Sequence, residues 1–371
     1  LRDRASDVHI EPTDGKMRIR FRIDGALHEV LSIPVSTGLE LVSRIKVMAE
    51  MDIVERRRAQ DGQFQLVVDG SSVDVRVATA STIWGEIAVL RLLDKRRSLK
   101  QLSELGMPPE AYARYMSILG RPYGMILCSG PTGAGKTTTL YASLAQITRA
   151  ELNVTTIEDP VEYVFPAINQ MQILPQAGIT FATGLKSILR QDPDVILVGE
   201  IRDEETAGIA VQSALTGHLV LSSIHATDAA SALFRLVDMG IEAFLVSSSV
   251  VGVVGQRLVR RICPSCVEPY TPTDAYLEWY QRLGGPPKET FMHGAGCNFC
   301  SNTGYRERVG VYEVLEVTPE IARVVIDRGS PVRVRELAAE AGMRSMAGEG
   351  MVMVSNDVTT IDEVVRNVHT G

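Results

Sequence analysis

The chain has few aromatic residues and no excess of positive charge. Aromatic side chains make up 5% of its 371 residues, and the net charge is −7. Nucleic-acid-binding proteins usually carry a basic surplus, and those that hold single strands add aromatic side chains for stacking. Basic clusters occur at 56–58, 95–97 and 257–261, but such runs are usually solvated faces or subunit contacts. The composition therefore predicts no nucleic-acid partner.

Long hydrophobic runs are also missing. One long stretch without a charged residue covers 206–227, and Gln212, Thr216 and His218 interrupt it. Because a membrane-spanning helix needs about 20 consecutive, mainly apolar residues, we expect no direct membrane span. A signal-peptide pattern is absent as well. The sequence opens on Leu1 rather than methionine and is strand-like by Val8, so we expect it to be part of a longer protein.

The hydrophobic periodicity of the first 100 residues predicts a small mixed α/β domain. A chain of this length exceeds what one hydrophobic core usually organises. Asp24-Gly25 is a hairpin signal between two alternating segments, and Ser36 is a candidate N-cap for one amphipathic helix. The charged segment 94–100 is the predicted linker to a second domain. The expected strands lie within 7–31 and at 63–68, 73–78 and 86–92, and the helix at 36–51.

From residue 123 onward, short apolar runs alternate with helical stretches. This alternation is typical of a parallel sheet that is covered by helices. From about residue 261 the pattern changes to a cysteine-containing module and then a helical tail. The predicted buried strands are 124–128, 153–157, 195–198 and 219–224.

A complete Walker A sequence, GPTGAGKT at 130–137, follows the first of these strands and precedes a helix. Glycines allow backbone amides to turn toward phosphate oxygens, and a helix N-terminus favours negative charge. We expect Lys136 to reach the β and γ phosphates of ATP and Thr137 to bind Mg²⁺. A chance glycine-rich turn is the alternative. The predicted nucleotide-binding residues are Gly130, Pro131, Thr132, Gly133, Ala134, Gly135, Lys136, Thr137 and Thr138.

Three further strands end in polar residues that can act on these phosphates. Ligands of an open parallel sheet lie at the carboxyl ends of its strands, where Glu158 and Glu162, then Glu200, then His225 follow. Asp194 precedes its strand, roughly 20 Å from the far end, so Glu200 is the predicted functional acid.

We expect Glu200 to activate the attacking water and Glu158 or Glu162 to hold Mg²⁺ through water. For Glu200 the alternative is an acid at a helix N-terminus. For His225 the alternative is a hydrogen-bonded loop histidine, and His218 is expected to be structural.

Four of the five cysteines form two Cys-x-x-Cys pairs, Cys263 with Cys266 and Cys297 with Cys300. Two such pairs that meet in space give a closed tetrahedral zinc site. Because no ligand position stays open, the zinc is expected to be structural. A redox pair or reduced core cysteines are the alternatives. Cys128 is left over.

Together these motifs resemble the type II secretion and type IV pilus assembly ATPases over nearly the whole chain. The resemblance implies a homo-hexameric motor at the inner face of the bacterial cytoplasmic membrane that powers pilin or pseudopilin assembly. Its implied partners are inner-membrane platform and cytoplasmic adaptor proteins. The matching segments are SDVHIE at 6–11, GPTGAGKT at 130–137, TIEDPVEY at 156–163, LRQDPD at 189–194, GEIRD at 199–203 and TGHLVLSSIH at 216–225.

The same resemblance implies a domain organisation. It gives a PAS-like α/β domain at 1–98 and a RecA-like ATPase domain at 99–371, which contains a zinc module at 262–305 and a helical subdomain at 306–371. Tetracysteine members of the family are assembly motors rather than retraction motors, so the cysteines favour extension.

Specific residues take roles from the same resemblance. Glu158 and Glu162 belong to the aspartate box, Glu200 is the catalytic carboxylate and His225 marks the histidine box. Arg76 and Arg91 match arginines that the N-terminal domain supplies to the nucleotide, and ordinary salt bridging on a strand is their alternative. Arg190 and Arg202 match as well, whereas Lys186 replaces an arginine of the secretion members.

Two rival functions share the phosphate-binding loop. A ring-shaped DNA translocase would bind DNA tightly at low salt and release it steeply as salt rises. A small-molecule kinase would transfer phosphate to an added acceptor, whereas a motor releases inorganic phosphate alone.

Overall fold

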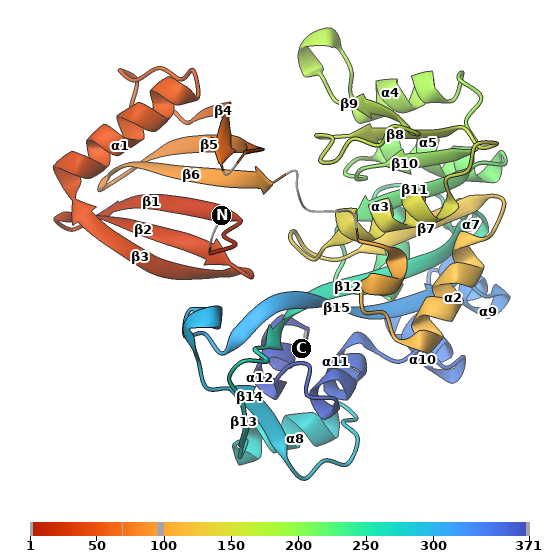
Figure 1. The fold of residues 1–371 in the computed structure, drawn as a ribbon. Coiled ribbons are helices and arrows are strands. Elements are labelled where there is room, and N and C mark those ends of the chain that lie inside the picture. Colours follow the sequence, from red (N-terminus) through yellow and green to blue (C-terminus); the bar gives the residue numbers. More distant parts are fainter. Residues whose placement is uncertain (1–2, 69, 95–99, 369–371) are drawn as a thin grey trace. The chain divides into compact units, whose positions relative to one another are not determined.

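The computed structural model describes residues 3–68, 70–94 and 100–368, and the chain divides into two compact units, Leu1–Ser98 and Leu99–Gly371 (Figure 1). Of the predicted linker 94–100, residues 95–99 lie outside the described residues, and the basic cluster 95–97 lies there too. Among the described residues, no helix has both the length and the apolar character that crossing a bilayer requires.

The first unit is a six-stranded antiparallel sheet in the order β3-β2-β1-β6-β5-β4, with one helix packed against it. Asp24 and Gly25, with φ angles of 47° and 89°, form the turn between β2 and β3, as a tight hairpin requires. The helix begins at Val35 with Pro34 at its N-cap, so the prediction of Ser36 as the cap was wrong. The elements are β1 (Asp7–Thr13), β2 (Lys16–Ile23), β3 (Ala26–Pro34), α1 (Val35–Met48), β4 (Gln60–Val68), β5 (Ser71–Thr82) and β6 (Gly85–Asp94).

The second unit is built on a seven-stranded sheet in the order β15-β12-β7-β11-β10-β8-β9. All neighbours pair in parallel except β12 with β15, so the predicted parallel sheet is confirmed. The strands are β7 (Gly124–Ser129), β8 (Val154–Glu158), β9 (Asn169–Gln172), β10 (Val195–Val198), β11 (Leu219–Ile224), β12 (Val250–Ile262) and β15 (Tyr305–Glu316).

Helices cover both faces of this sheet, and a separate two-stranded sheet joins β13 (Val267–Tyr270) to β14 (Phe291–Gly294). Short 3-10 helices lie at Leu102–Glu104, Pro175–Ala177 and Asn298–Cys300. The helices are α2 (Pro109–Leu119), α3 (Lys136–Ile147), α4 (Phe181–Ile188), α5 (Glu204–Leu215), α6 (Ala229–Asp238), α7 (Ala243–Ser249), α8 (Asp274–Arg282), α9 (Pro319–Ile326), α10 (Pro331–Glu340), α11 (Met346–Ser355) and α12 (Ile361–Asn367).

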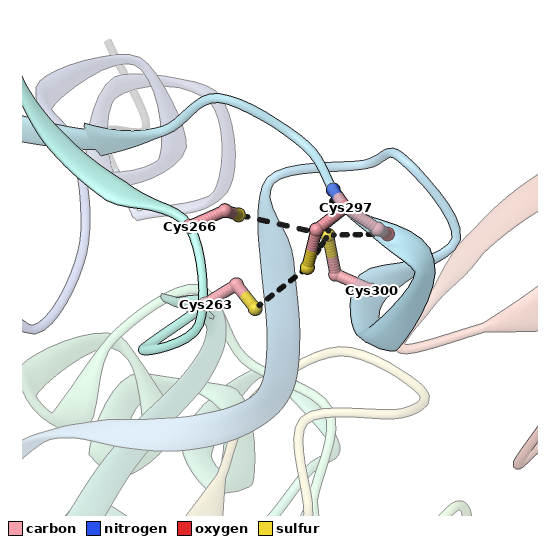
Figure 2. Close-up of side chains that lie close together, drawn as sticks. All are labelled: Cys263, Cys266, Cys297 and Cys300. Atoms are coloured by element: carbon pink, nitrogen blue, oxygen red, sulfur yellow. Dashed lines mark hydrogen bonds between the residues drawn. The ribbon is translucent and has the colours of Figure 1, made fainter.

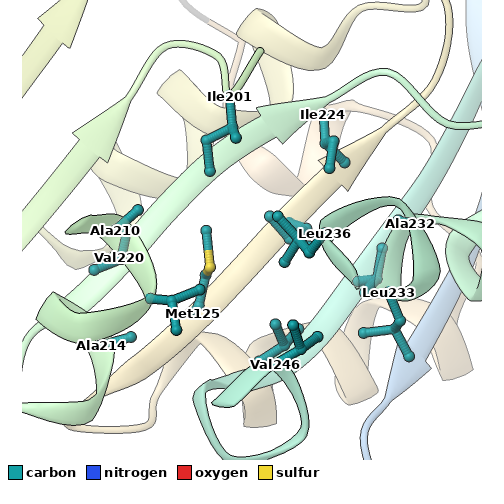
Figure 3. Close-up of a cluster of buried hydrophobic side chains, with 14 of the residues drawn as sticks. Met125, Ile201, Ala210, Ala214, Val220, Ile224, Ala232, Leu233, Leu236 and Val246 are labelled. Carbon is teal, nitrogen blue, oxygen red and sulfur yellow. The ribbon is translucent and has the colours of Figure 1, made fainter. Parts of the chain in front are cut away.

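Strand β7 shows how the sheet divides the core into two layers. Met125 and Leu127 belong to the cluster on the side of α5, α6 and α7, part of which Figure 3 shows, while Ile126 and Cys128 belong to the cluster on the side of α2 and α3. Successive side chains of a strand point to opposite faces, and burying one large apolar side chain contributes roughly 1.5–3 kcal/mol. A strand that is buried on both faces holds the loop that follows it in a fixed place.

The C-terminal region differs from its expected helical form. Residues 305–316 form strand β15, which pairs along β12 before the helices α9 to α12 follow. Strands β12 and β15 are long, and they extend from the main sheet to the region of β13, β14 and α8 (Figure 1).

Candidate functional site

The phosphate-binding loop connects the end of β7 to the start of α3, as the sequence predicts. Gly130, Gly133 and Gly135 have φ angles of 152°, 79° and 87°, which side-chain-bearing residues rarely adopt. A Cβ at Gly130 would lie 2.5 Å from the backbone oxygen of Gln256, and one at Gly135 would lie 2.8 Å from its Nε2. A Cβ at Gly133 would meet no atom within 4 Å. The loop is therefore packed against β12 on one side and open at Gly133.

Lys136 closes the loop from within. Its Nζ donates to the backbone oxygens of Gly130, at 2.8 Å, and Pro131, at 3.0 Å. Burial lowers the pKa of Lys136, while the nearby Glu200 carboxylate opposes that shift. The first amides of α3 have no intrahelical acceptor, and Thr137 stands in its first turn. The start of a helix, a cation and open space at Gly133 fit the phosphates of a nucleotide.

Glu200 is fixed between two neighbouring strands. The amide of Gly199 donates to the oxygen of Ile157, at 2.8 Å, and the amide of Ile201 donates to the oxygen of Ser223, at 3.0 Å. These bonds continue the sheet past the end of β10 on both sides. A Cβ at Gly199 would come within 3.2 Å of the Ile157 oxygen, so the close approach favours glycine here.

The Glu200 carboxylate contacts two of the predicted site residues. Its Oε1 lies 2.6 Å from Nη2 of Arg202, and its Oε2 lies 3.7 Å from Nε2 of His225. The Glu200 side chain is 15% exposed, against 47% for His225 and 66% for Arg202. The arrangement presents a carboxylate that is held by a guanidinium and stands beside an imidazole, at the carboxyl edge of the sheet.

The charges of this cluster follow from its surroundings. Burial lowers the pKa of His225, the Lys136 cation lowers it further, and the Glu200 carboxylate opposes both. The imidazole is therefore neutral near pH 7. The bond to Glu200 raises the pKa of Arg202, which keeps that side chain charged.

Glu158 is buried, in contrast to Glu200. It is 4% exposed, its Oε2 accepts from the Tyr141 hydroxyl, and its Oε1 accepts from Thr156 Oγ1 at 2.6 Å and from Gln170 Nε2 at 3.2 Å. Glu162 lies exposed farther along the same segment. Of the two carboxylates expected to hold Mg²⁺ through water, Glu162 is the accessible one.

Sequence reasoning missed Gln256 as a neighbour of the loop and placed Arg257 only in a basic cluster. Gln256 Oε1 accepts from Thr139 Oγ1 at 2.7 Å, and Arg257 Nη2 donates to the Thr227 oxygen at 2.6 Å. Burial lowers the pKa of Arg257. The available signal was a Gln-Arg pair within the apolar run VVGVVGQRLV, because polar residues in a buried strand need specific partners.

A buried carboxylate lies behind this part of the site. Glu313 is 5% exposed and accepts from the amides of Ala229, at 2.6 Å, and Met346, at 3.2 Å. It thereby joins β15 to the first residues of α6 and α11. Burial raises the pKa of Glu313, with Asp228 adding to the shift and the two amides and Arg257 opposing it.

Three residues near the sheet have structural contacts instead. Asp194 Oδ2 accepts from the amide of Asn153 at 2.7 Å, at the edge opposite to Glu200. His218 Nδ1 lies 2.9 Å from the oxygen of Ser213. Lys186 pairs with Glu205 on the surface at 2.6 Å.

The two arginines of the first unit are direct cross-strand partners. Arg76 on β5 lies opposite Arg91 on β6, and like charges in this position destabilise a sheet. Asp7 Oδ1 lies 3.1 Å from Nε of Arg91, whose side chain is 64% exposed. The pair therefore places two guanidinium groups side by side on the sheet, and the Asp7 carboxylate offsets part of their charge.

The four cysteines of the two pairs form one cluster (Figure 2). Their sulfurs lie within 4.8 Å of one another, with 3.9 Å between Cys263 and Cys297 and 3.8 Å between Cys266 and Cys300. Tetrahedral zinc with Zn–S bonds of about 2.3 Å requires sulfurs about 3.8 Å apart, so the cluster fits zinc. The amides of Gly296 and Cys297 point at Cys266 Sγ, at 3.3 Å, and Cys300 Sγ, at 3.1 Å, as in sulfur sites with outer-shell support.

Comparison with known proteins gives a consistent result. The family model described as Type II/IV secretion system protein matches residues 1–366. The chain is 47% identical to Type II secretion system protein E of Dickeya dadantii, covering 99% of this chain and 73% of that protein. It is 43% identical to the type IV pilus assembly ATPase PilB of Myxococcus xanthus, covering 99% of this chain and 65% of that protein. The solved structure of the Legionella pneumophila ATPase DotB shares the fold, with a TM-score of 0.71 at 20% identity over 97% of this chain and 90% of that one.

Proposed function

The chain belongs to the type II/IV secretion system protein family, and from that premise we propose that it hydrolyses ATP to power pilin or pseudopilin assembly, in type II secretion or type IV pilus extension. In this proposal it works as a homo-hexamer at the inner face of a bacterial cytoplasmic membrane. Its partners are platform and adaptor proteins of the machine. The observation that carries the proposal is the phosphate-binding loop with the Lys136 Nζ bonded inside it, at the same carboxyl edge of the sheet as the Glu200 carboxylate.

Each residue at the edge of the sheet has a distinct task in this reaction. Bound Mg²⁺ and ATP supply the phosphoryl group that is cleaved and the metal charge that offsets its negative charge. The loop amides and Lys136 hold the phosphates in line, and Thr137 and Glu162 hold the metal, Glu162 through water. Glu200 accepts a proton from the attacking water, while Arg202 keeps its carboxylate in one orientation.

His225 and the two arginines of the first unit have separate tasks in this proposal. A neutral imidazole beside Glu200 donates or accepts a hydrogen bond without competing for the negative charge. Arg76 and Arg91, which match arginines that the family supplies to the nucleotide, provide positive charge for the phosphates in this proposal. Zinc held by the four cysteines is structural, since all four ligand positions are filled by protein.

Substitution of Lys136 by alanine tests the nucleotide site. We expect Lys136→Ala to lower ATP turnover by at least about 100-fold, because the lysine contacts the phosphates that carry the developing charge. Lys186→Ala is the matched control, since this lysine is exposed and pairs only with Glu205 among the described residues. A wild-type chain without affinity for adenine nucleotides, or an unchanged turnover in Lys136→Ala, contradicts the proposal.

Two measurements separate the rival functions and test the ring. Release of inorganic phosphate without transfer to any added acceptor indicates a motor rather than a kinase. Sizing the protein with and without a nonhydrolysable ATP analogue tests the hexamer. A particle that stays monomeric in both cases contradicts the ring.

A further inference from the structure

Tyr141 lies on the helix that carries the phosphate-binding lysine, four residues after Thr137. Residues four apart occupy the same face of a helix, so the two side chains follow one another along α3. Thr137 is half-buried at the open end, whereas Tyr141 is fully buried. The ring therefore has a fixed place one turn beyond the proposed metal ligand.

The hydroxyl of Tyr141 joins α3 to Glu158, the last residue of β8, and to the backbone of Glu162 in the segment that follows. It donates to Glu158 Oε2, and it accepts from the amide of Glu162 at 3.2 Å. A phenol can donate and accept at once, so a single oxygen holds the beginning and the end of the segment 158–162. Phenylalanine would keep the ring and lose both bonds.

Two aromatic residues that follow the segment 158–162 pack against the same ring. Tyr163 and Phe165 pack edge-on against Tyr141, with ring centroids 5.9 Å and 5.2 Å away and interplanar angles of 79° and 86°. Gln170 on β9 ties the segment from its other side, since its Nε2 donates to the oxygen of Tyr163 at 2.9 Å and its Oε1 accepts from the amide of Phe165 at 2.7 Å. Tyr141 thus contacts the segment that carries Glu162 both through its hydroxyl and through its ring.

We propose that Tyr141 is a positioning residue that sets the separation between Thr137 and the acidic segment 158–162, and so determines how tightly Mg²⁺ is held with the nucleotide. The inference rests on the proposed function, because it needs Thr137 and Glu162 to share the metal. It concerns a residue that touches neither nucleotide nor metal. We expect a substitution at Tyr141 to change the Mg²⁺ concentration that the reaction requires more than it changes the affinity for the nucleotide.

The experiment compares Tyr141→Phe with Tyr115→Phe in the whole chain. Tyr115 is the matched control, because it is equally buried and its hydroxyl also bonds to α3, 2.7 Å from Ser143 Oγ, away from the acidic segment. Loss of an outer-shell partner typically lowers metal affinity or activity by 10- to 100-fold. We expect Tyr141→Phe to raise by about 10-fold the Mg²⁺ concentration at which a nonhydrolysable ATP analogue is half-maximally bound, and to raise that for half-maximal ATP hydrolysis by the same factor, while the KM for ATP at saturating Mg²⁺ stays within about twofold. Tyr115→Phe is expected to leave all of these unchanged.

A double-mutant cycle distinguishes positioning from general loosening. If Tyr141 acts through the acidic segment, Tyr141→Phe adds little to the effect of Glu162→Gln, since coupled residues are not additive. Additive effects, or an unchanged Mg²⁺ requirement in Tyr141→Phe, overturn the inference. These outcomes do not contradict the proposed function. The proposed function is contradicted instead if Lys136→Ala has no effect on turnover.

A second variant covers the case in which Tyr141→Phe does not fold. Phe165→Leu removes a ring that packs on Tyr141 and keeps the hydroxyl and its bonds. We expect the Mg²⁺ requirement to rise by about threefold, because only the packing of the segment is loosened. An unchanged requirement in a folded Phe165→Leu protein also contradicts the inference.

Discussion

The carboxyl edge of the main sheet and the cysteine cluster differ in how accessible their polar groups are. At the sheet edge, the Glu200 carboxylate is partly accessible and its neighbours His225 and Arg202 are about half-exposed or more. In the cluster, four sulfurs already lie at the spacing of a tetrahedral ion. An accessible edge leaves room for a reactant, whereas a closed set of ligands stabilises the structure. The comparison predicts that ATP turnover and zinc binding in this chain can be lost independently of one another.

Loss of zinc is the largest expected effect and tests the closed site. Structural zinc contributes on the order of 10 kcal/mol to folding of small zinc-binding peptides. We expect a chelator, or Cys297→Ser, to remove the metal and to speed hydrogen exchange in 262–305 by at least about 100-fold, because the segment loses its main constraint. The affinity for ATP is expected to stay within about twofold.

Cys128→Ser is the control for this measurement, since Cys128 is the cysteine outside the cluster. Metal content is measured on both variants. Retention of stoichiometric zinc in Cys297→Ser, or loss of zinc in Cys128→Ser, would show that the cluster is not the site.

Glu200→Gln tests the open edge and has the next largest expected effect. Removing a general base lowers a rate by about 10²- to 10⁴-fold. We expect such a loss in kcat with nucleotide binding and zinc content retained, because the loop at 199–201 is held by backbone bonds that the amide does not disturb. Single-turnover hydrolysis and nucleotide binding measure the two quantities separately. A kcat within threefold of the wild type would refute the role of Glu200.

Glu313→Gln tests the buried carboxylate and has a moderate expected effect. The pKa of Glu313 is raised in the folded state, so between the unfolded value near 4.5 and the raised value the native protein binds more protons than the unfolded chain. Stability from this group is therefore present at low pH and is lost as pH rises through that window. We expect the wild type to exceed Glu313→Gln in thermal stability most at the acidic end, with a difference that shrinks toward neutral pH.

The size of this difference follows from the hydrogen bonds that the carboxyl makes. One buried polar partner is worth about 1–3 kcal/mol, and Glu313 accepts from two backbone amides. Thermal unfolding of both proteins as a function of pH gives the result. A difference that is constant with pH would mean that Glu313 does not titrate in this range.

Asp194→Asn is expected to have the smallest effect, although it alters an acid at the other end of the same strand as Glu200. The asparagine oxygen can still accept from the amide of Asn153, and surface changes of this kind usually alter stability by less than about 0.5 kcal/mol. We expect kcat and the thermal midpoint to match those of the wild type. A tenfold loss of turnover in this variant would remove the distinction between the two ends of β10.

Much of the fold was predictable because local signals agree with it. The runs 195–198 and 219–224 are continuous apolar segments bounded by polar residues, and both were predicted with their observed bounds. The cysteine spacing and the phosphate loop are likewise written in contiguous residues. Where each strand ends then determines which side chains meet, so the contact between Glu200 and His225 followed from the order of elements.

The missed features depend on partners that are distant in sequence. Strand β12 contains Gln256 and Arg257, two polar residues that are unusual in a buried strand. Their hydrogen-bond partners, the Thr139 hydroxyl and the Thr227 backbone oxygen, lie far away in the sequence. Residues 306–316 were assigned to a helical subdomain, whereas they form most of strand β15, whose pairing partners on β12 are distant in the sequence. The burial of Glu158 was hidden for the same reason, since Tyr141 and Gln170 reach it from other elements.

Strand β12 connects the region of the phosphate-binding loop to the cysteine cluster. It runs beside β7 up to the phosphate loop, and its last residue, Ile262, directly precedes Cys263. Thirteen residues of strand extend about 43 Å, stiffened over most of that length by β15, with a register shift between Arg260 and Ile262. Any change in the direction of β12 at the loop would therefore change the position of the cysteine cluster, and the pairing with β15 is irregular only at the end that lies next to the cysteines.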